Sequence, residues 1–297
     1  MNNAGSRRLV FSNRKFFFGG ILVFSIIAVG ILSPVLIRHD PLKFNLSDKL
    51  RGPSSKYLMG TDNYGRDIYS RVILGTPMTL ALGISSVLIT LTISVPLGLF
   101  TGFVGGRTDQ LLMRINDTFM ALPALFLALL LVSIRSTLEQ YLKIPSTWWF
   151  DPYPVIVIGL TMVPRTIRVI RSVAMDLKEQ DFVEAARARG ERVFHILFSE
   201  MLPNVWPVII VEGGIRISYA IIMGATLSFL GLGASPPAPA WGLMIYEAKG
   251  FLYLAPWGLL FPSLALSMTI VIFNLFGDGL RDLLDPMERT SLLTKQL

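Results

Sequence analysis

The 297-residue chain contains no cysteine and only two histidines. Without cysteine there are no disulfides, thiolate metal ligands or thiol nucleophiles, so neither a disulfide-stabilised secreted fold nor a zinc fold can be argued. Charged residues are also scarce, at 16%, whereas hydrophobic residues make up 52% and the mean hydropathy is +0.58. These values do not suit a surface that faces water, and they indicate that much of the chain faces lipid.

The net charge of +7 also requires an explanation. No basic patch with interleaved aromatic residues occurs, so we expect no nucleic-acid partner. Positive charge beside apolar spans is typical of the cytoplasmic face of membrane proteins, and we interpret the charge as a signal of topology.

Apolar runs of about 20 residues, the length that crosses the hydrocarbon layer, recur along the chain. They predict an all-α integral membrane protein with six transmembrane helices. The predicted spans are 16–37, 75–106, 118–134, 152–164 with a continuation through three arginines, 204–230 and 257–276. The first run is longer than the apolar part of a signal peptide and no small-residue cleavage site follows it, so we expect it to be retained.

The distribution of Lys and Arg predicts the orientation of these spans. With both termini inside, the inner connections hold more Lys and Arg than the outer ones, although the segment between the first two spans is itself rich in them. We therefore expect an N-in, C-in protein of the cytoplasmic membrane. The predicted division is a cytoplasmic N-terminal segment 1–15, a first helix 16–37, an external segment 38–74, a five-helix core domain 75–280 and a cytoplasmic tail 281–297.

Prolines interrupt most spans, and each leaves a backbone carbonyl that lipid cannot satisfy. Two interpretations stand side by side: kinked helices around a cavity, or ordinary packing of kinked helices. The prolines are Pro34, Pro96, Pro123, Pro164, Pro207 and Pro262.

The longest inner connection, 175–203, joins the fourth and fifth spans. Good helix formers fill 179–188, Gly190 breaks the run, and apolar residues at helical spacing follow before Pro203. We predict two short helices here. Ala185, Ala186 and Gly190 are small, which permits the close approach of another surface.

Several motifs in the chain resemble those of a known protein family. The connection carries Glu184-Ala185-Ala186, then Gly190, then Leu202-Pro203, and the external segment carries the run from Gly60 to Asp67. Further matches are Val95-Pro96-Leu97-Gly98, Ser228 to Gly233, Pro236-Pro237 with Trp241-Gly242, and Phe273 to Pro286. From about residue 58 to 286 the chain resembles the permeases of bacterial ATP-binding-cassette importers, in the dipeptide, oligopeptide and nickel branch of the C-subunit type.

The resemblance implies that the inner connection docks in a groove of an ATPase subunit. The coupling residues that it implies are Glu184, Ala185, Ala186, Arg187, Gly190, Phe194, Leu202 and Pro203. Two features depart from the family pattern. Glu200 stands where Ile or His is common, which puts the docking surface there in doubt. The segment 135–150 matches no family block, and its Trp148-Trp149 pair suits either the outer mouth or the lipid headgroup level.

The chain has no Gly-x-x-x-x-Gly-Lys-Ser/Thr loop to hold nucleotide phosphates, so we expect it to be a translocation subunit and not an enzyme. The resemblance implies two ATP-binding partner subunits, a paralogous permease and an extracytoplasmic substrate-binding protein. ATP is then used by the partners, and this chain itself binds no cofactor. Alternating access would move the substrate, with peptide preferred and nickel or another small solute as the alternative.

Three further sets of charged residues carry open interpretations. Glu212 and Arg216 are four residues apart within a span, and they form either a pathway lining or an internal ion pair. Arg165, Arg168 and Arg171 either hold the coupling loop or the ATPase partner, or they are ordinary positive-inside anchors at the end of the helix. In the external element, comprising Gly60, Thr61, Asp62, Gly65, Arg66 and Asp67, we favour a cap with internal salt bridges over substrate binding.

Two other classes of membrane protein, intramembrane enzymes and secondary transporters, fit the sequence less well. An intramembrane enzyme needs a catalytic dyad or a metal set, but His39 and His195 fall on opposite sides of the predicted bilayer, so we expect no metal site that joins them. Asp278, Asp282 and Asp285 are expected to cap or pair near the end of the last helix. A secondary transporter driven by an ion gradient is disfavoured because only Glu212 and Arg216 approach the midplane.

Overall fold

The computed structural model describes residues 14–134, 147 and 151–284. Within these ranges the regular structure is helical, apart from one isolated bridge between Thr61 and Asp67. The predicted all-α fold is therefore confirmed. Residues Trp148 and Trp149, and Asp285, lie outside the described residues.

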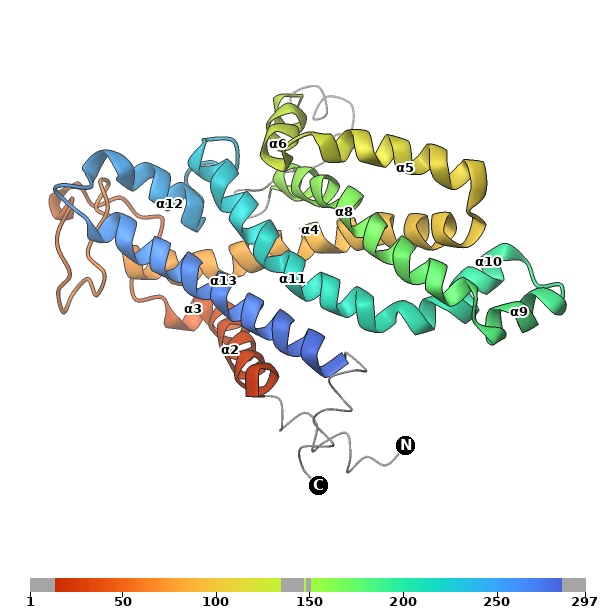
Figure 1. The fold of residues 1–297 in the computed structure, drawn as a ribbon. Helices are drawn as coiled ribbons and strands as arrows, with labels where there is room; N and C mark the ends of the chain where they lie inside the picture. Colours follow the sequence, from red (N-terminus) through yellow and green to blue (C-terminus); the bar gives the residue numbers. More distant parts are fainter. Residues whose placement is uncertain (1–13, 135–146, 148–150, 285–297) are drawn as a thin grey trace.

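Long helices run side by side along the molecule, and most of the short helices lie at its two ends (Figure 1). The long or bundle-forming helices are α2 (Arg14–Ile31), α4 (Ile68–Val104), α5 (Gly106–Ala121), α6 (Ala124–Ser133), α8 (Pro152–Lys178), α11 (Leu202–Phe229) and α13 (Trp257–Leu284). The short ones are α3 (Ser33–Leu36), α9 (Asp181–Ala188), α10 (Val193–His195) and α12 (Trp241–Ala248). The helix α12 and residues 38–67 lie at one end of the bundle, and α9 and α10 lie at the other.

In the part of the chain that the structure describes, five helices are long and apolar enough to cross a membrane: α2, α4, α8, the helix that runs from Val193 to Phe229, and α13. Helices α5 and α6 pass the same test together but bend by 90° at the residues between them. The six predicted spans are thus present when this bent pair counts as one. The predicted third span, 118–134, is not a single helix. It breaks at Leu122 and Pro123, because a proline has no backbone N–H and restricts the residue before it.

Helix boundaries differ from the prediction at several ends. Helix α4 begins at Ile68, seven residues before the predicted 75, because the Asp67 carboxylate accepts a hydrogen bond from the Ser70 N–H and caps it. Helix α13 continues to Leu284, beyond the predicted 276. The first predicted span is divided into α2 and α3.

The inner connection contains one separate short helix, not the two that we predicted. Helix α9 stands apart, but the chain from Val193 onward forms a continuous helix to Phe229. A π-helical turn, Ile196–Met201, joins α10 to α11, and Pro203 lies in the first turn of α11. Pro203 therefore does not end the pattern, since proline is tolerated in a first helical turn and the π turn before it shifts the hydrogen-bond spacing.

Helices α4 and α8 pack closely through two glycines one turn apart. A Cβ atom on Gly98 would lie 2.7 Å from the Ile170 Cβ, and one on Gly102 would lie 2.6 Å from the Ala174 Cβ. Small residues four apart let helix backbones approach in membranes, where no hydrophobic effect drives helices together. This contact joins α8, which leads into the inner connection, to the centre of the bundle.

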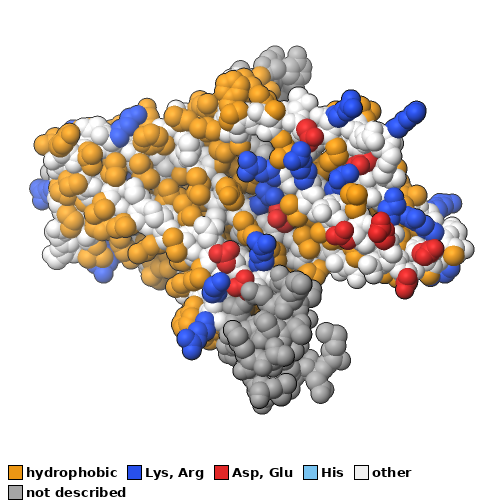
Figure 2. Space-filling view, viewed as in Figure 1, with side chains coloured by type: hydrophobic (Ala, Val, Ile, Leu, Met, Phe, Trp, Pro, Cys, Tyr) orange, Lys and Arg blue, Asp and Glu red, His pale blue; other side chains and the backbone are white. Residues whose placement is uncertain are grey.

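Figure 2 shows that hydrophobic and charged side chains gather toward opposite ends of one face of the molecule. Hydrophobic side chains cover much of the end that holds α12 and the start of α13, whereas Lys, Arg, Asp and Glu gather toward the end that holds α5 and α9. The charged end is the end that we predicted to be cytoplasmic.

We expect Gly102→Leu to separate α4 from α8 and to lower the thermal midpoint of the purified protein. Overpacking of a tight contact costs about 1–3 kcal/mol. Gly20→Leu is the matched control, because a Cβ on Gly20 would meet only the Phe276 ring, at 3.9 Å. Equal midpoints for the two variants would show that the glycine contact does not determine the packing.

Candidate functional site

Helix α9 is held to the bundle by its apolar side. Val183 and Ala186 are fully buried, in a cluster that includes Ile170 and Ala174 of α8 and Met201 before α11. The cluster also contains Leu99 and Phe103 of α4. A displacement of α9 therefore acts directly on three of the long helices, because close-packed cores transmit strain.

Gly190 ends α9 in a defined geometry. Its φ is +76°, the Gly190 N–H donates to the Arg187 carbonyl at 2.9 Å, and the Glu191 N–H donates to the Ala186 carbonyl at 3.2 Å. This pair of hydrogen bonds is the Schellman motif, which favours glycine at the left-handed position. A Cβ on Gly190 would meet nothing within 4 Å, so its backbone conformation, not a close contact, requires glycine here.

The predicted coupling residues divide into an exposed set and an inward set. Glu184, Ala185, Arg187 and Gly190 are exposed, as are Phe194 and Pro203, whereas Leu202 is half-buried. Ala186 is buried in the bundle, so it does not belong to the small exposed surface that we predicted. The Arg187 guanidinium lies 4.7 Å from the centre of the Phe103 ring.

An aromatic pair extends the exposed surface beyond α9. The Phe194 side chain is 74% exposed, and its ring stacks with that of Phe198 at a centroid distance of 6.4 Å. Large exposed apolar side chains on a charged surface are typical of an interaction site.

The three arginines of α8 do not all have the same surroundings. Arg171 forms two hydrogen bonds of 2.6 Å with the Asp109 carboxylate of α5, and Arg168 pairs with Asp117 of α5 at 2.6 Å. Arg165 is exposed. Two of the three therefore tie α5 to α8, an internal role that our two interpretations did not include.

Glu212 and Arg216 contact each other within α11. Their side-chain oxygen and nitrogen are 2.5 Å apart, and both side chains are mostly buried. This is the geometry of the internal ion pair, and the role of the two residues as a pathway lining stays a prediction. A cavity of about 350 Å³ lies further out, between α4, α8, α11 and α12, with Met78, Ile221 and Trp241 in its wall.

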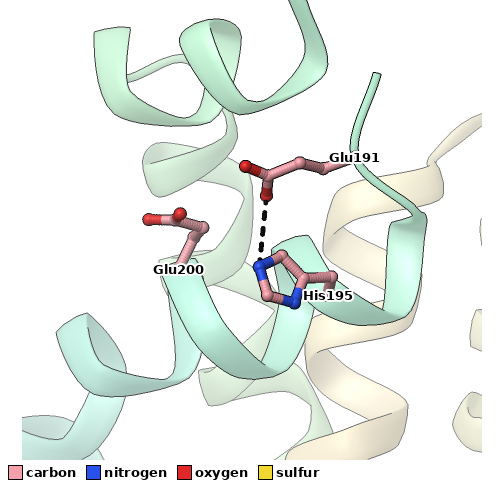
Figure 3. A group of neighbouring side chains, drawn as sticks. All are labelled: Glu191, His195 and Glu200. Atoms are coloured by element: carbon pink, nitrogen blue, oxygen red, sulfur yellow. Dashed lines mark ion pairs between the residues drawn. The ribbon is translucent and has the colours of Figure 1, made fainter. Parts of the chain in front are cut away.

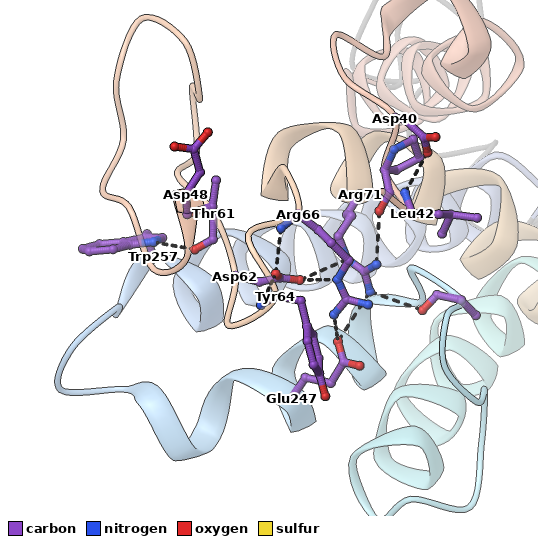
Figure 4. Close-up of polar contacts among 12 residues, drawn as sticks. Asp40, Leu42, Asp48, Thr61, Asp62, Tyr64, Arg66, Arg71, Glu247 and Trp257 are labelled. Atoms are coloured by element: carbon purple, nitrogen blue, oxygen red, sulfur yellow. Dashed lines mark hydrogen bonds and ion pairs between the residues drawn. The ribbon is translucent and has the colours of Figure 1, made fainter. Parts of the chain in front are cut away.

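The external element builds a buried charge cluster (Figure 4). The Arg66 guanidinium donates to Asp62 at 2.6 Å and to Glu247 of α12 at 2.6 Å, and Arg71 lies 3.5 Å from the same Glu247 carboxylate. Arg66 and Arg71 are each 1% exposed. Gly60 and Gly65 have φ of +75° and +73°, which permits the tight turns around Asp62. The cluster clamps residues 38–67 to α4 and α12.

A second carboxylate organises the same external segment. Asp48 accepts hydrogen bonds from Lys56 at 2.8 Å and from the Tyr57 hydroxyl at 2.7 Å, and it pairs with Arg51 at 2.9 Å. The hydrogen bond from Lys56, followed by that from Tyr57, lowers the pKa of Asp48 below its usual range. The Thr61 carbonyl accepts from the Trp257 indole at 3.2 Å, which joins this segment to α13.

Glu191, His195 and Glu200 meet where α9 turns into the next helix (Figure 3). One ligand atom from each lies within 4.8 Å of the others. Arg189 pairs with Glu191 at 2.6 Å and with Glu200 at 3.2 Å. Glu200 is the residue that departs from the family pattern, and it here contributes to a charged cluster on the inner surface.

Lys15 of α2 pairs with Asp282 near the end of α13 at 3.0 Å. For Asp282, this agrees with the prediction that the aspartates near the end of the last helix cap it or form pairs. No pattern in the sequence marks Asp109, Asp117, Arg71 or Glu247 as functional or structural partners. Each is more than 50 residues away from at least one of its partners, and no local spacing signals such a contact.

A bundle of long apolar helices with a charged end, and with an exposed helix on that end, is the architecture expected of a multi-pass membrane protein. Residues 94–290 match the family model described as binding-protein-dependent transport system inner membrane component. The chain belongs to this family. It is a permease subunit of an ATP-binding-cassette importer and a multi-pass protein of the bacterial cytoplasmic membrane, and it works with ATPase and substrate-binding partners.

Curated relatives cover most of the chain. It is 39% identical over 268 residues to the glutathione transport system permease of Pectobacterium atrosepticum, covering 90% of this chain and 85% of that protein. It is 36% identical over 280 residues to the dipeptide transport system permease of Haemophilus influenzae, covering 92% and 91%. A chain of the inward-facing MetNI methionine ABC transporter has a similar fold, with a TM-score of 0.57 at 16% identity, over 72% of this chain and 96% of that one.

We expect Glu247→Gln to destabilise the protein strongly, because it leaves Arg66 and Arg71 buried with only Asp62 as a counter-charge. Breaking a buried ion pair costs about 3–5 kcal/mol. The control Asp117→Asn removes the partner of Arg168 from a pair in which both side chains are 51% exposed, where a loss below about 1 kcal/mol is expected. Thermal melting of both purified variants measures the difference, and a larger loss in the control would contradict the buried clamp.

Acid should loosen the external segment through Asp48. Its folded pKa lies below the unfolded value near 4, so its contribution to stability is fully present above that value and is lost as the pH falls through the folded pKa. We expect the thermal midpoint of wild type to fall below about pH 4 more steeply than that of Asp48→Asn. Asp40→Asn, a change of an exposed carboxylate in the same segment, should keep the wild-type slope. Parallel curves for wild type and Asp48→Asn would refute the assignment.

Proposed function

We propose that this chain is the permease of a peptide importer and that it carries dipeptides or oligopeptides across the cytoplasmic membrane by alternating access. The proposed assembly contains a paralogous permease, two ATP-binding subunits and an extracytoplasmic substrate-binding protein. Both termini lie in the cytoplasm. ATP is used by the partner subunits, and this chain has no ATPase site of its own.

One observation supports the coupling role above the others. Helix α9 presents Glu184, Ala185 and Arg187 outward while its Val183 and Ala186 are packed among α4, α8 and the residues before α11. One side is thus available to a partner, and the other side is fixed to the helices that must move. A partner can shift the equilibrium between two states of the bundle only through contacts that differ between those states.

The names of several relatives support peptide as the cargo. Permeases for dipeptides and for glutathione, itself a tripeptide, are among them. Nickel or another small solute, carried by the same mechanism, is the alternative. An ion-gradient-driven carrier is less well supported, because Glu212 and Arg216, the two charges within α11, already pair with each other.

Glu184→Lys tests the coupling role. We expect ATP-driven peptide uptake by the complete importer in vesicles to fall by at least about tenfold, within the range of typical coupling energies, because the change reverses a charge on the exposed side of α9. Membrane insertion should stay normal. Gly190→Pro should act similarly, since proline cannot adopt the φ of +76° or donate the Gly190 hydrogen bond.

Asp278→Lys is the matched control, with the same change of charge at an exposed position on α13 outside the inner connection 175–203. Full uptake in Glu184→Lys at normal expression would contradict the coupling role. Uptake that proceeds on an ion gradient without ATP would contradict the importer mechanism itself.

A further inference from the structure

We propose that Glu191, His195 and Glu200 form a binding site for a divalent transition-metal ion such as Zn²⁺, and that the bound ion restrains the coupling helix. The site is distinct from the exposed side of α9 and from the charge clusters of the external segment. Its regulatory effect rests on the proposed function of α9, whereas its metal binding does not.

The backbone brings the three ligands together across a break in the helix. Glu191 follows Gly190 in the turn after α9, His195 ends α10 four residues later, and Glu200 lies within the π turn Ile196–Met201. Hydrogen bonds five residues apart bring residues 195 and 200 toward one side of such a turn, and π turns are often found at functional sites.

The separation of the first two ligands suits a shared metal ion better than a hydrogen bond. The His195 Nε2 and the Glu191 Oε2 are 3.5 Å apart, which is long for a hydrogen bond. Two ligands on one tetrahedral zinc with bonds of about 2.0–2.1 Å lie roughly 3.4 Å apart. All three ligand atoms are within 4.8 Å of one another, so a shift of about 1 Å in these side chains completes the set.

Among the described residues, no donor satisfies one of the two carboxylate oxygens of Glu191. Its Oε2 is buried and accepts no hydrogen bond, although Arg189 holds the other oxygen, Oε1, at 2.6 Å. A buried acceptor without a partner points to an ion or a water, and this one faces the imidazole (Figure 3).

The surrounding residues orient the ligands without occupying the site. The Ser199 hydroxyl lies 3.3 Å from the His195 Nδ1, the ring nitrogen remote from Glu191, in the way that an outer partner fixes the tautomer of a metal-bound histidine. Arg189 contacts the Oε1 atoms of Glu191 and Glu200, which leaves their Oε2 atoms for the metal. Two carboxylates, one neutral imidazole and one guanidinium carry a net charge of −1 before the ion binds.

A metal ion at this position would join the end of α9 to the helix that continues into α11. A Cβ on Gly190 would meet nothing within 4 Å, so the two hydrogen bonds of the Schellman motif are what limit the freedom of this turn. Tying Glu191 to His195 and Glu200 removes that freedom. We therefore expect the ion to slow transport by restraining the coupling helix.

Isothermal titration of the purified complete importer with Zn²⁺, without nucleotide, tests the site. Wild type should bind one more Zn²⁺ ion per chain than His195→Gln, and Glu200→Gln should weaken that binding by at least about tenfold. The controls are His39→Gln, which removes the other histidine, and Glu179→Gln, which removes an exposed carboxylate before α9; both should bind as wild type does.

Equal Zn²⁺ binding by wild type and His195→Gln, both monodisperse by size exclusion, would overturn the site. ATP-driven uptake is then measured with and without Zn²⁺. Inhibition in wild type that is lost in His195→Gln supports the restraint, whereas binding without any change in uptake overturns it. A failure of the importer mechanism would show as uptake independent of ATP, with the titration unchanged.

Discussion

The burial of α9 against the bundle is the contact on which the rest of the account depends. Val183 and Ala186 have no exposed surface, and they pack against residues of α4, α8 and the turn before α11. Because the packing is tight, α9 cannot move alone, and it either carries these helices with it or separates from them. The exposed side of α9 can serve a partner only because its other side is fixed in this way.

Charge secures the two ends of the molecule by different means. At the end that holds α12, Arg66, Arg71, Asp62 and Glu247 lie within a buried cluster that holds residues 38–67 on α4 and α12. At the end that holds α9, Asp109 and Asp117 pair with arginines of α8 that are partly exposed. Buried pairs are costly to break and exposed pairs are not, so the α12 end is expected to be the rigid one and the α9 end the adaptable one.

Much of the fold could be predicted from the sequence because the signals are local. Apolar runs of the right length predicted the long helices, and Gly190 marked the end of α9 because its left-handed backbone conformation favours glycine.

Three features of the fold could not be predicted from the sequence. The 90° bend between α5 and α6 depends on where the flanking helices pack, although Pro123 marks its position. The continuity of α10 with α11 depends on a π turn that has no sequence signature. The partners of Arg66 and Arg171 come from helices distant in the chain. The family motifs predicted a coupling surface on α9. Only the structure shows that Ala185 belongs to its exposed side and that Ala186 is buried.

The location of α9 relative to the membrane and to its partner is the most direct test. The chain has no cysteine, so Ala185→Cys introduces a single reactive position on the exposed side of α9. In inside-out vesicles the account predicts that a membrane-impermeant maleimide labels this cysteine, and that bound ATPase subunits protect it. Labelling in right-side-out vesicles, or labelling that the ATPase subunits leave unchanged, would contradict the account.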